Sequence, residues 1–160
     1  MYIGIGYDIH RFGADRPLIL GGVRFPGESG LVGHSDADPV MHAIADAVLG
    51  AAALGDLGQH FPDTEARWEN ADSADILGQV LRMVREKRSL VPGNVDVNVV
   101  AERPRLAERT AEMRRRLAEV LHLSVERVSV KGRSAEGLGP VGRGKAVEVH
   151  AAVLLVSADP

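Results

Sequence analysis

The N-terminal segment, residues 2–12, alternates between two kinds of side chain, and this pattern constrains the fold more than any other feature of the sequence. From residue 3 onward, large apolar residues occupy the odd positions, whereas two glycines and then Asp8 and His10 occupy the even positions. A period of two is typical of a strand with two unlike faces. Asp8 and His10 therefore point to the same side, about 6.6 Å apart along the backbone, close enough to converge on one ion.

A second group of polar residues is expected on a helix. Asp38 and Pro39 form a helix start, with aspartate as the N-cap and proline at the first helical position. Asp38, His42 and Asp46 then recur at intervals of four and make one polar stripe. Most such stripes are simply solvated, and an Asp–His pair on a strand is more often a hydrogen-bonded pair than a metal site.

Together, Asp8, His10 and His42 match the three-ligand pattern of an open zinc site, in which the fourth position is left to water or substrate. The chain has no cysteine, which excludes thiolate zinc sites, a disulfide framework and a cysteine nucleophile. An open site without sulfur suits a phosphate oxygen as the fourth ligand. We therefore predict that these three residues bind a divalent metal ion and serve phosphate chemistry.

The bulk composition excludes several classes of function. The chain has 160 residues and a net charge of −3, from 22 acidic and 19 basic residues, so no overall field attracts nucleic acid or an anionic membrane. The sequence contains neither a signal-peptide pattern nor an apolar run long enough to span a membrane. We expect a single catalytic domain over residues 1–160, located in the cytoplasm.

The remaining pattern predicts an α/β (α+β) fold. Strands are expected at residues 2–12, 94–101, 127–131 and 146–156, a hairpin at 17–25, and helices at 38–53, from Ser73 onward and at 106–123. These elements favour a mixed four-stranded sheet with helices on one face, a small hairpin and a ferredoxin-like βαβ arrangement. Residues 55–72 are rich in turn formers, and so long a connection is usually functional or mobile.

Residues 137–144 form a glycine-rich stretch that includes the spacing G-x-G-x-x-G. A dinucleotide-binding loop needs these glycines to open a helix after a strand, but here they precede the strand-like residues 146–149. Two interpretations remain. The stretch is either a glycine-rich hairpin loop or part of an anion-binding loop, in which Ser134 and backbone amides contact phosphate while Glu136 holds a second cation.

Longer motifs along nearly the whole chain resemble one family, the 2-C-methyl-D-erythritol 2,4-cyclodiphosphate synthases of the non-mevalonate isoprenoid pathway. In order, the motifs are GYDIH at 6–10, GHSDAD at 33–38, ADAVLGAAALGDLG at 45–58, FPDT at 61–64, ADS at 71–73, NVDV at 94–97 and GRG at 142–144. The chain departs from the family pattern at Glu102, Arg133, Pro140 and Val141.

The resemblance implies a reaction. The chain is expected to convert 4-diphosphocytidyl-2-C-methyl-D-erythritol 2-phosphate to the 2,4-cyclodiphosphate, by attack of the 2-phosphate on the β-phosphate and release of CMP. It implies zinc at the three predicted ligands and a second divalent ion, Mg²⁺ or Mn²⁺, at Glu136. His34 and Ser134 match positions that stabilise the transition state. The resemblance also implies a homotrimer with active sites between subunits.

The resemblance further implies two sets of substrate contacts. Those on the methylerythritol phosphate side are Asp8, Ile9, His10, His34, Ser35, Asp56, Leu57, Gly58, Phe61, Pro62, Asp63, Thr64 and Glu65. Those on the cytidine and α-phosphate side are Ala101, Glu102, Arg103, Pro104, Arg105, Leu106, Ala107, Arg133, Ser134, Ala135 and Glu136, with Arg143 as a further contact.

Two other functions stay open. A metal-dependent phosphohydrolase would use the same ion to activate water, and would release inorganic phosphate instead of CMP. A non-catalytic trimer that binds isoprenoid diphosphates would need no second metal site. A phosphate monoester has its second pKa near 6, so the attacking phosphate is already ionised at neutral pH and the synthase needs no general base.

Overall fold

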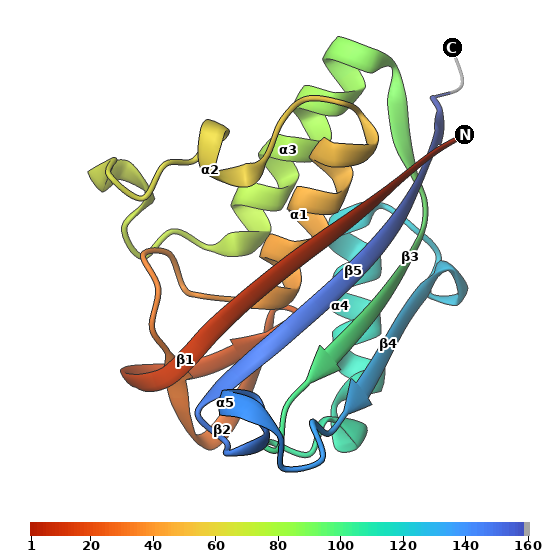
Figure 1. The fold of residues 1–160 in the computed structure, drawn as a ribbon. Helices are drawn as coiled ribbons and strands as arrows, with labels where there is room; N and C mark the ends of the chain where they lie inside the picture. The colour runs from red at the N-terminus through yellow and green to blue at the C-terminus, as the bar shows by residue number, and fades with distance from the viewer. Residues whose placement is uncertain (159–160) are drawn as a thin grey trace.

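The computed structural model describes residues 1–158, and a mixed sheet forms one layer of the molecule, with the long helices behind it (Figure 1). In the order in which they lie side by side, its strands are β2 (Val23–Leu31), β1 (Tyr2–Leu20), β5 (Ala146–Ser157), β3 (Leu90–Val100) and β4 (Val128–Arg133). Strands β3 and β4 are parallel, and all other neighbours are antiparallel.

Strand β1 is long enough to pair with β5 along its first half and with β2 along its second. Residues Tyr2–Arg11 pair with β5, and the rest of the strand pairs with β2 through a tight turn at Gly21-Gly22. Both turn glycines have positive φ angles, 60° and 72°, which glycine adopts without steric cost. The four-stranded sheet and the small hairpin predicted from the sequence are therefore both present. The predicted fold class is confirmed, with β2 extending the sheet to five strands.

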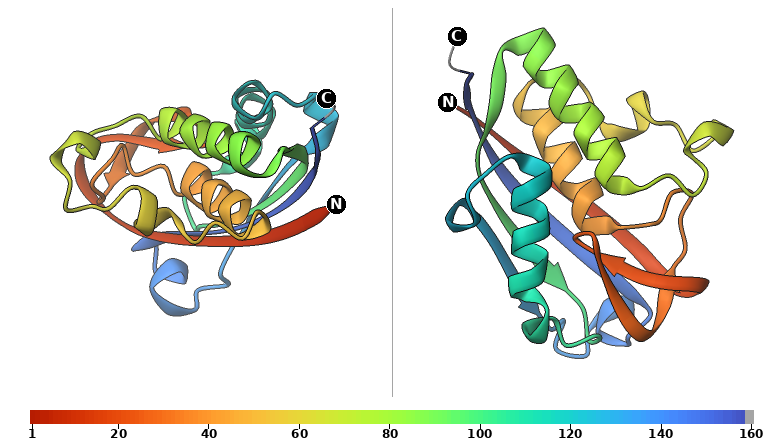
Figure 2. Two further views of the ribbon diagram at one scale, coloured as in Figure 1. Left: turned by 90° about the horizontal axis from the view of Figure 1, so that it is seen from above. Right: turned by 180° about the vertical axis from the view of Figure 1, so that it is seen from behind.

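Three helices cover one face of the sheet (Figure 2): α1 (Pro39–Ala51), α3 (Ser73–Arg88) and α4 (Thr110–Leu121). Helix α4 connects the parallel strands β3 and β4, so these three elements form a βαβ unit. The short helix α5 (Gly139–Gly142) lies on the opposite face.

The longest predicted connection contains a further short helix, α2 (Leu57–His60), and 3-10 turns occupy Ala66–Trp68, Leu106–Glu108 and Val125–Arg127. Within residues 1–158, no helix is both long and apolar enough to cross a membrane.

Helices α3 and α4 begin at other residues than the sequence predicts. Ser73 is predicted to cap α3, but Asp72 takes that position, because its carboxylate accepts the Ala74 N–H at 2.8 Å. Ser73 is thus the first helical residue, and its hydroxyl is free to bond elsewhere. Helix α4 starts later than predicted because residues 106–108 form a 3-10 turn.

The glycines of β1 set the distance between the sheet and α1. A Cβ atom at Gly6 would collide with the Ala43 carbonyl oxygen and come within 2.7 Å of the Ala47 nitrogen, and Gly4 meets the next turn of α1 in the same way. The backbone of α1 therefore rests directly on β1. This close packing brings His42, on α1, beside Asp8 on β1.

The opposite face of β1 is exposed. Ile3, Ile5 and Ile9 are 75%, 81% and 43% exposed, and Tyr7 lies between them. Figure 2 shows that this face of the sheet lies away from the three long helices. These four side chains form an exposed apolar row along β1, a feature that is uncommon on the surface of a monomeric protein.

We expect Gly6→Ala to lower the free energy of unfolding by about 1–3 kcal/mol, because the added methyl must push α1 away from β1. Chemical denaturation measures this change. The control is Gly78→Ala in α3, where an added Cβ has no atom within 4 Å and alanine should stabilise the helix by about 0.5–1 kcal/mol. Equal stability of Gly6→Ala and the wild type would contradict the close packing.

Candidate metal centre and active site

Three side chains converge where β1 crosses α1. Asp8 Oδ2 lies 2.9 Å from His10 Nε2 and 3.0 Å from His42 Nδ1. One ligand atom of each residue lies within 4.8 Å of the other two, so all three can bind a single ion. Strand periodicity aligns the first two residues, and helix α1 presents the third. The structure therefore brings together the three residues predicted as metal ligands.

Each of the two imidazole rings forms a hydrogen bond through the nitrogen that faces away from Asp8. His10 Nδ1 lies 2.7 Å from the Val32 carbonyl oxygen, to which it donates a hydrogen bond. His42 Nε2 lies 2.9 Å from Ser73 Oγ and 3.1 Å from Ser35 Oγ. In both rings, a hydrogen on the outer nitrogen leaves the lone pair of the inner nitrogen facing the centre, as metal ligation requires.

The surroundings of Asp8 and His10 favour the charged form of each side chain. Burial opposes ionisation of Asp8, but hydrogen bonds with His10 and His42 outweigh it and hold the pKa of Asp8 below its usual range. Burial also lowers the pKa of His10, yet the hydrogen bond and the charge of Asp8 leave it raised overall. A divalent ion would replace the protons that otherwise balance the Asp8 carboxylate.

Asp38 holds the first turn of α1, the helix that carries His42. It is fully buried and caps α1, since its carboxylate accepts the N–H groups of Val40 and Met41 at 3.0 and 3.3 Å. The same carboxylate accepts the N–H groups of Gly21 and Gly22 at 2.9 and 2.6 Å. Burial raises the pKa of Asp38 to about 6, although these donors favour its charged form. Asp38 thus ties the hairpin turn to the start of the ligand-bearing helix.

A cavity of about 260 Å³ opens beside the cluster. Of the residues predicted to contact the methylerythritol phosphate, it is lined by His10, His34, Ser35, Leu57, Phe61 and Asp63. Gly33, His42, Trp68 and Ile76 complete its lining. The loop of residues 55–72, expected to be functional, therefore forms one wall of the cavity.

Specific contacts shape this wall. His34 Nε2 lies 3.1 Å from the Glu65 carbonyl oxygen. The rings of Phe61 and Trp68 pack edge-on, with their centres 4.9 Å apart. Asp46, the last member of the predicted stripe, accepts the Leu57 N–H at 3.2 Å and so anchors α2. Asp56, Gly58, Pro62 and Thr64 lie on the same loop. Ile9 instead exposes its side chain on the opposite face of the sheet.

A second cavity, of about 360 Å³, lies between the ends of β3 and β4 and the start of α4. Its lining includes eight residues predicted for the cytidine side: Ala101, Glu102, Pro104, Arg105, Leu106, Ala107, Arg133 and Ser134. Thr110 and Gly132 complete it. Within residues 1–158, the two cavities have no lining residue in common.

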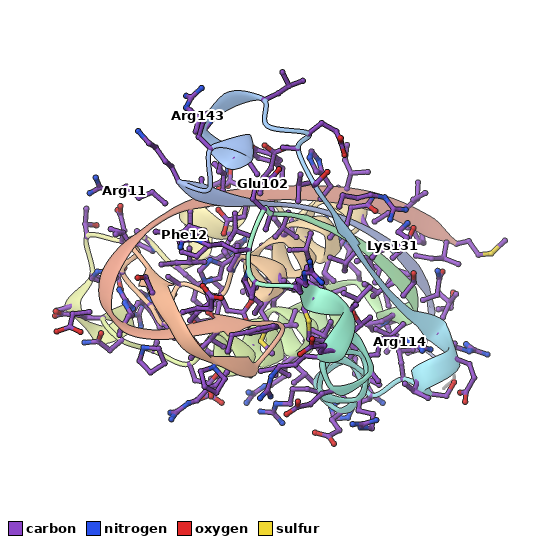
Figure 3. The ribbon with its side chains drawn as sticks, turned by 90° about the horizontal axis from the view of Figure 1, so that it is seen from below. Arg11, Phe12, Glu102, Arg114, Lys131 and Arg143 are labelled. Atoms are coloured by element: carbon purple, nitrogen blue, oxygen red, sulfur yellow. The ribbon has the colours of Figure 1, made fainter. Side chains whose placement is uncertain are left out.

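The loop after β4 carries the remaining predicted residues. Ser134 donates its hydroxyl hydrogen to the Glu136 carboxylate, and the Ala135 N–H donates to Glu102 Oε1 at 2.9 Å. Arg143 follows the last residue of α5 and projects outward in the view from below (Figure 3). Arg103 lies outside the second cavity, with its guanidinium 5.6 Å from the centre of the Phe12 ring.

Four residues of the site were missed by sequence reasoning. The Arg16 guanidinium donates to the carbonyl oxygens of Gly33 and Ser35 and so holds the loop that carries His34. The Val32 carbonyl oxygen accepts a hydrogen bond from His10. Ser73 lies behind His42 and donates its hydroxyl hydrogen to Asp36. Asp36 and Ser73 lie in the GHSDAD and ADS motifs, which gave no role for either, and no motif included Arg16 or Val32.

Comparisons with known proteins agree with this geometry. The model of the YgbB family matches residues 1–156. The chain belongs to the YgbB family. The resemblance seen in the sequence motifs is thereby confirmed. A 2-C-methyl-D-erythritol 2,4-cyclodiphosphate synthase from Salinibacter ruber is 52% identical over 158 residues, which is 99% of this chain and 100% of the relative.

Solved structures of the family share the fold of this chain. The bifunctional IspDF from Campylobacter jejuni superposes with a TM-score of 0.94 at 39% identity, and the match covers 99% of this chain and 42% of the longer protein. A CDP-bound 2C-methyl-D-erythritol-2,4-cyclodiphosphate synthase superposes with a TM-score of 0.87 at 35% identity, covering 96% and 99% of the two chains.

We expect His42→Ala to weaken binding of a divalent ion by more than about 100-fold. Loss of a residue that only hydrogen-bonds to a metal ligand typically weakens binding about 10- to 100-fold. Competition with a chromophoric chelator measures the affinity, and metal analysis gives the stoichiometry. The matched control is His122→Asn, because His122 is exposed and ends α4 in a left-handed conformation that asparagine tolerates. Equal loss of metal from both variants would refute the assignment.

Proposed function

We propose that this chain catalyses the reaction named for its full-length relatives, the formation of 2-C-methyl-D-erythritol 2,4-cyclodiphosphate with release of CMP. The observation that carries the proposal is the cluster of Asp8, His10 and His42 at the edge of a cavity, in a chain that matches the YgbB family from residue 1 to residue 156. The substrate is 4-diphosphocytidyl-2-C-methyl-D-erythritol 2-phosphate. A cytoplasmic location remains a prediction.

The donor set suits zinc. Two imidazoles and one carboxylate leave a fourth position for a phosphate oxygen. A zinc ion bound there would withdraw charge from the β-phosphate and make its phosphorus more electrophilic. His34 and Ser35 line the same cavity, and we assign them to the phosphate groups of the methylerythritol portion.

The reaction then requires alignment more than proton transfer. An oxygen of the 2-phosphate forms a bond to the β-phosphorus, and the bond from that phosphorus to the bridging oxygen breaks. CMP leaves with the electron pair on its α-phosphate. Because the 2-phosphate is already ionised near neutral pH, the chain needs oriented donors around the two anions, and we assign this role to His34 and Ser134.

The second cavity is the proposed site for the cytidine and the α-phosphate. It combines the apolar side chain of Leu106 with the charges of Arg105 and Arg133, which suit a base and a phosphate respectively. We assign Glu136 to a second divalent ion, Mg²⁺ or Mn²⁺, because carboxylate oxygens and phosphate oxygens are the ligands such ions prefer. The CDP-bound relative supports a cytidine nucleotide as ligand.

We further propose a homotrimer with active sites between subunits. The metal cavity and the nucleotide cavity of the described chain have separate linings, so one substrate is best held by cavities of two chains. The exposed face of Ile3, Ile5, Tyr7 and Ile9 offers the apolar surface that a subunit contact would bury.

We expect the purified protein, given the cytidylyl substrate and metal ions, to form CMP and a cyclic diphosphate in equal amounts, which ³¹P NMR resolves. His34→Ala should lower kcat about 100- to 1,000-fold, the usual loss when one transition-state donor is removed, and a chelator should abolish turnover. Release of inorganic phosphate would favour the phosphohydrolase instead, and tight binding of isoprenoid diphosphates without turnover would favour the non-catalytic trimer.

We expect two inactive variants to restore each other. Asp8→Asn removes a ligand from the metal half of the site, and Glu136→Ala alters the nucleotide half. After random mixing of unfolded chains and refolding, about a quarter of intersubunit sites combine two intact halves. Activity of the mixture should therefore approach that fraction of wild type, while each variant alone stays inactive. A mixture that remains inactive would place both halves in one chain.

A further inference from the structure

The hydroxyl of Ser73 occupies an unusual position behind His42. Ser73 is 1% exposed, and its Oγ lies 2.9 Å from His42 Nε2, the ring nitrogen that faces away from Asp8. This contact exists because Asp72, not Ser73, caps α3. The hydroxyl of a helix-capping serine accepts a hydrogen bond from a backbone N–H, whereas the hydroxyl of Ser73 is available to bond with the imidazole.

Asp36 receives the hydrogen of that hydroxyl. Ser73 Oγ donates to Asp36 Oδ1, and the Ser73 backbone N–H donates to Asp36 Oδ2 at 3.2 Å. The Asp36 N–H in turn donates to the Ala71 carbonyl oxygen at 3.0 Å, and the Asp38 N–H donates to Asp36 Oδ1 at 3.2 Å. The carboxylate is therefore fixed from both sides.

This chain of contacts determines which nitrogen of His42 carries hydrogen. A serine hydroxyl has one hydrogen, and once it is given to Asp36 the oxygen can only accept from the ring. His42 Nε2 must then carry hydrogen. When an ion takes the place of the hydrogen that Nδ1 shares with Asp8, at 3.0 Å, the lone pair of Nδ1 faces that ion. Ser35 also lies 3.1 Å from Nε2, but its Oγ accepts the Ala37 N–H at 3.2 Å, which leaves its hydrogen free to turn toward either side.

We infer that Ser73 and Asp36 are positioning residues for the metal site, which hold His42 in the tautomer and orientation that ligate the ion. The inference rests on the proposed metal function, and neither residue belongs to the predicted substrate contacts. Because Asp36 also holds Ala71, at the end of the 55–72 loop, the same hydrogen bonds join the cavity wall to the metal ligand.

The test is zinc affinity, measured by competition with a chromophoric chelator. Ser73→Ala should bind zinc 10- to 100-fold more weakly than wild type, the range typical of lost outer contacts. Asp36→Asn should also weaken binding, and the double variant should lose little more than the worse single variant, because both residues act through one hydrogen-bonded chain. Ser124→Ala is the matched control, since Ser124 is exposed and its side chain makes no capping bond.

A second readout separates positioning from simple stabilisation. In the metal-free protein, ¹⁵N NMR of the histidine rings should show hydrogen on His42 Nε2 in wild type. Ser73→Ala should lose part of that hydrogen and shift toward the tautomer in which only Nδ1 donates, to Asp8. Lower thermal stability with unchanged zinc affinity and an unchanged tautomer would overturn the inference. Should Ser73→Ala not fold, Asp36→Asn gives the same two readouts. Failure of the wild type to bind zinc would instead overturn the proposed function.

Discussion

The direct contact between the backbones of β1 and α1 is the constraint on which the rest of the structure depends. Gly4 and Gly6 lack the Cβ atoms that would hold α1 away, so the helix settles onto the strand. Two residues after Gly6, the carboxylate of Asp8 lies 3.0 Å from His42 Nδ1 on that helix. Residues that are to share one metal ion tolerate little displacement, because the distances between an ion and its ligands vary by only a few tenths of an ångström.

The same packing accounts for the exposed apolar face. With the glycines turned toward α1, the period of two sends Ile3, Ile5 and Ile9 to the far side of the sheet. An ordinary two-layer protein buries such residues beneath its helices. Here the close helix contact that brings the three candidate ligands together leaves an apolar surface that the helices do not cover. The geometry of the candidate site and the exposed apolar face thus have one origin in the sequence of β1.

Much of this was readable from the sequence, and the failures have physical causes. The period of two placed Asp8 and His10 on one side, and the Asp-Pro helix start placed His42 correctly. The role of Ser73 was not predictable, because Asp72 and Ser73 are both good caps and a shift of one residue changes what each side chain reaches. Nor could the pattern show two separate cavities, since these depend on how distant loops fold over the sheet.

The distribution of carboxylates explains how a site rich in acidic residues can still attract phosphate. Among residues 1–158, Asp8 supplies the one carboxylate of the three-residue cluster, so a divalent ion with two neutral imidazoles would keep one positive charge. Asp38 is engaged by four backbone N–H groups, and Asp36 by the hydroxyl and N–H of Ser73. Because backbone donors hold these two carboxylates away from the ligand position, their charges support the histidine ligand without cancelling the field that a phosphate must meet.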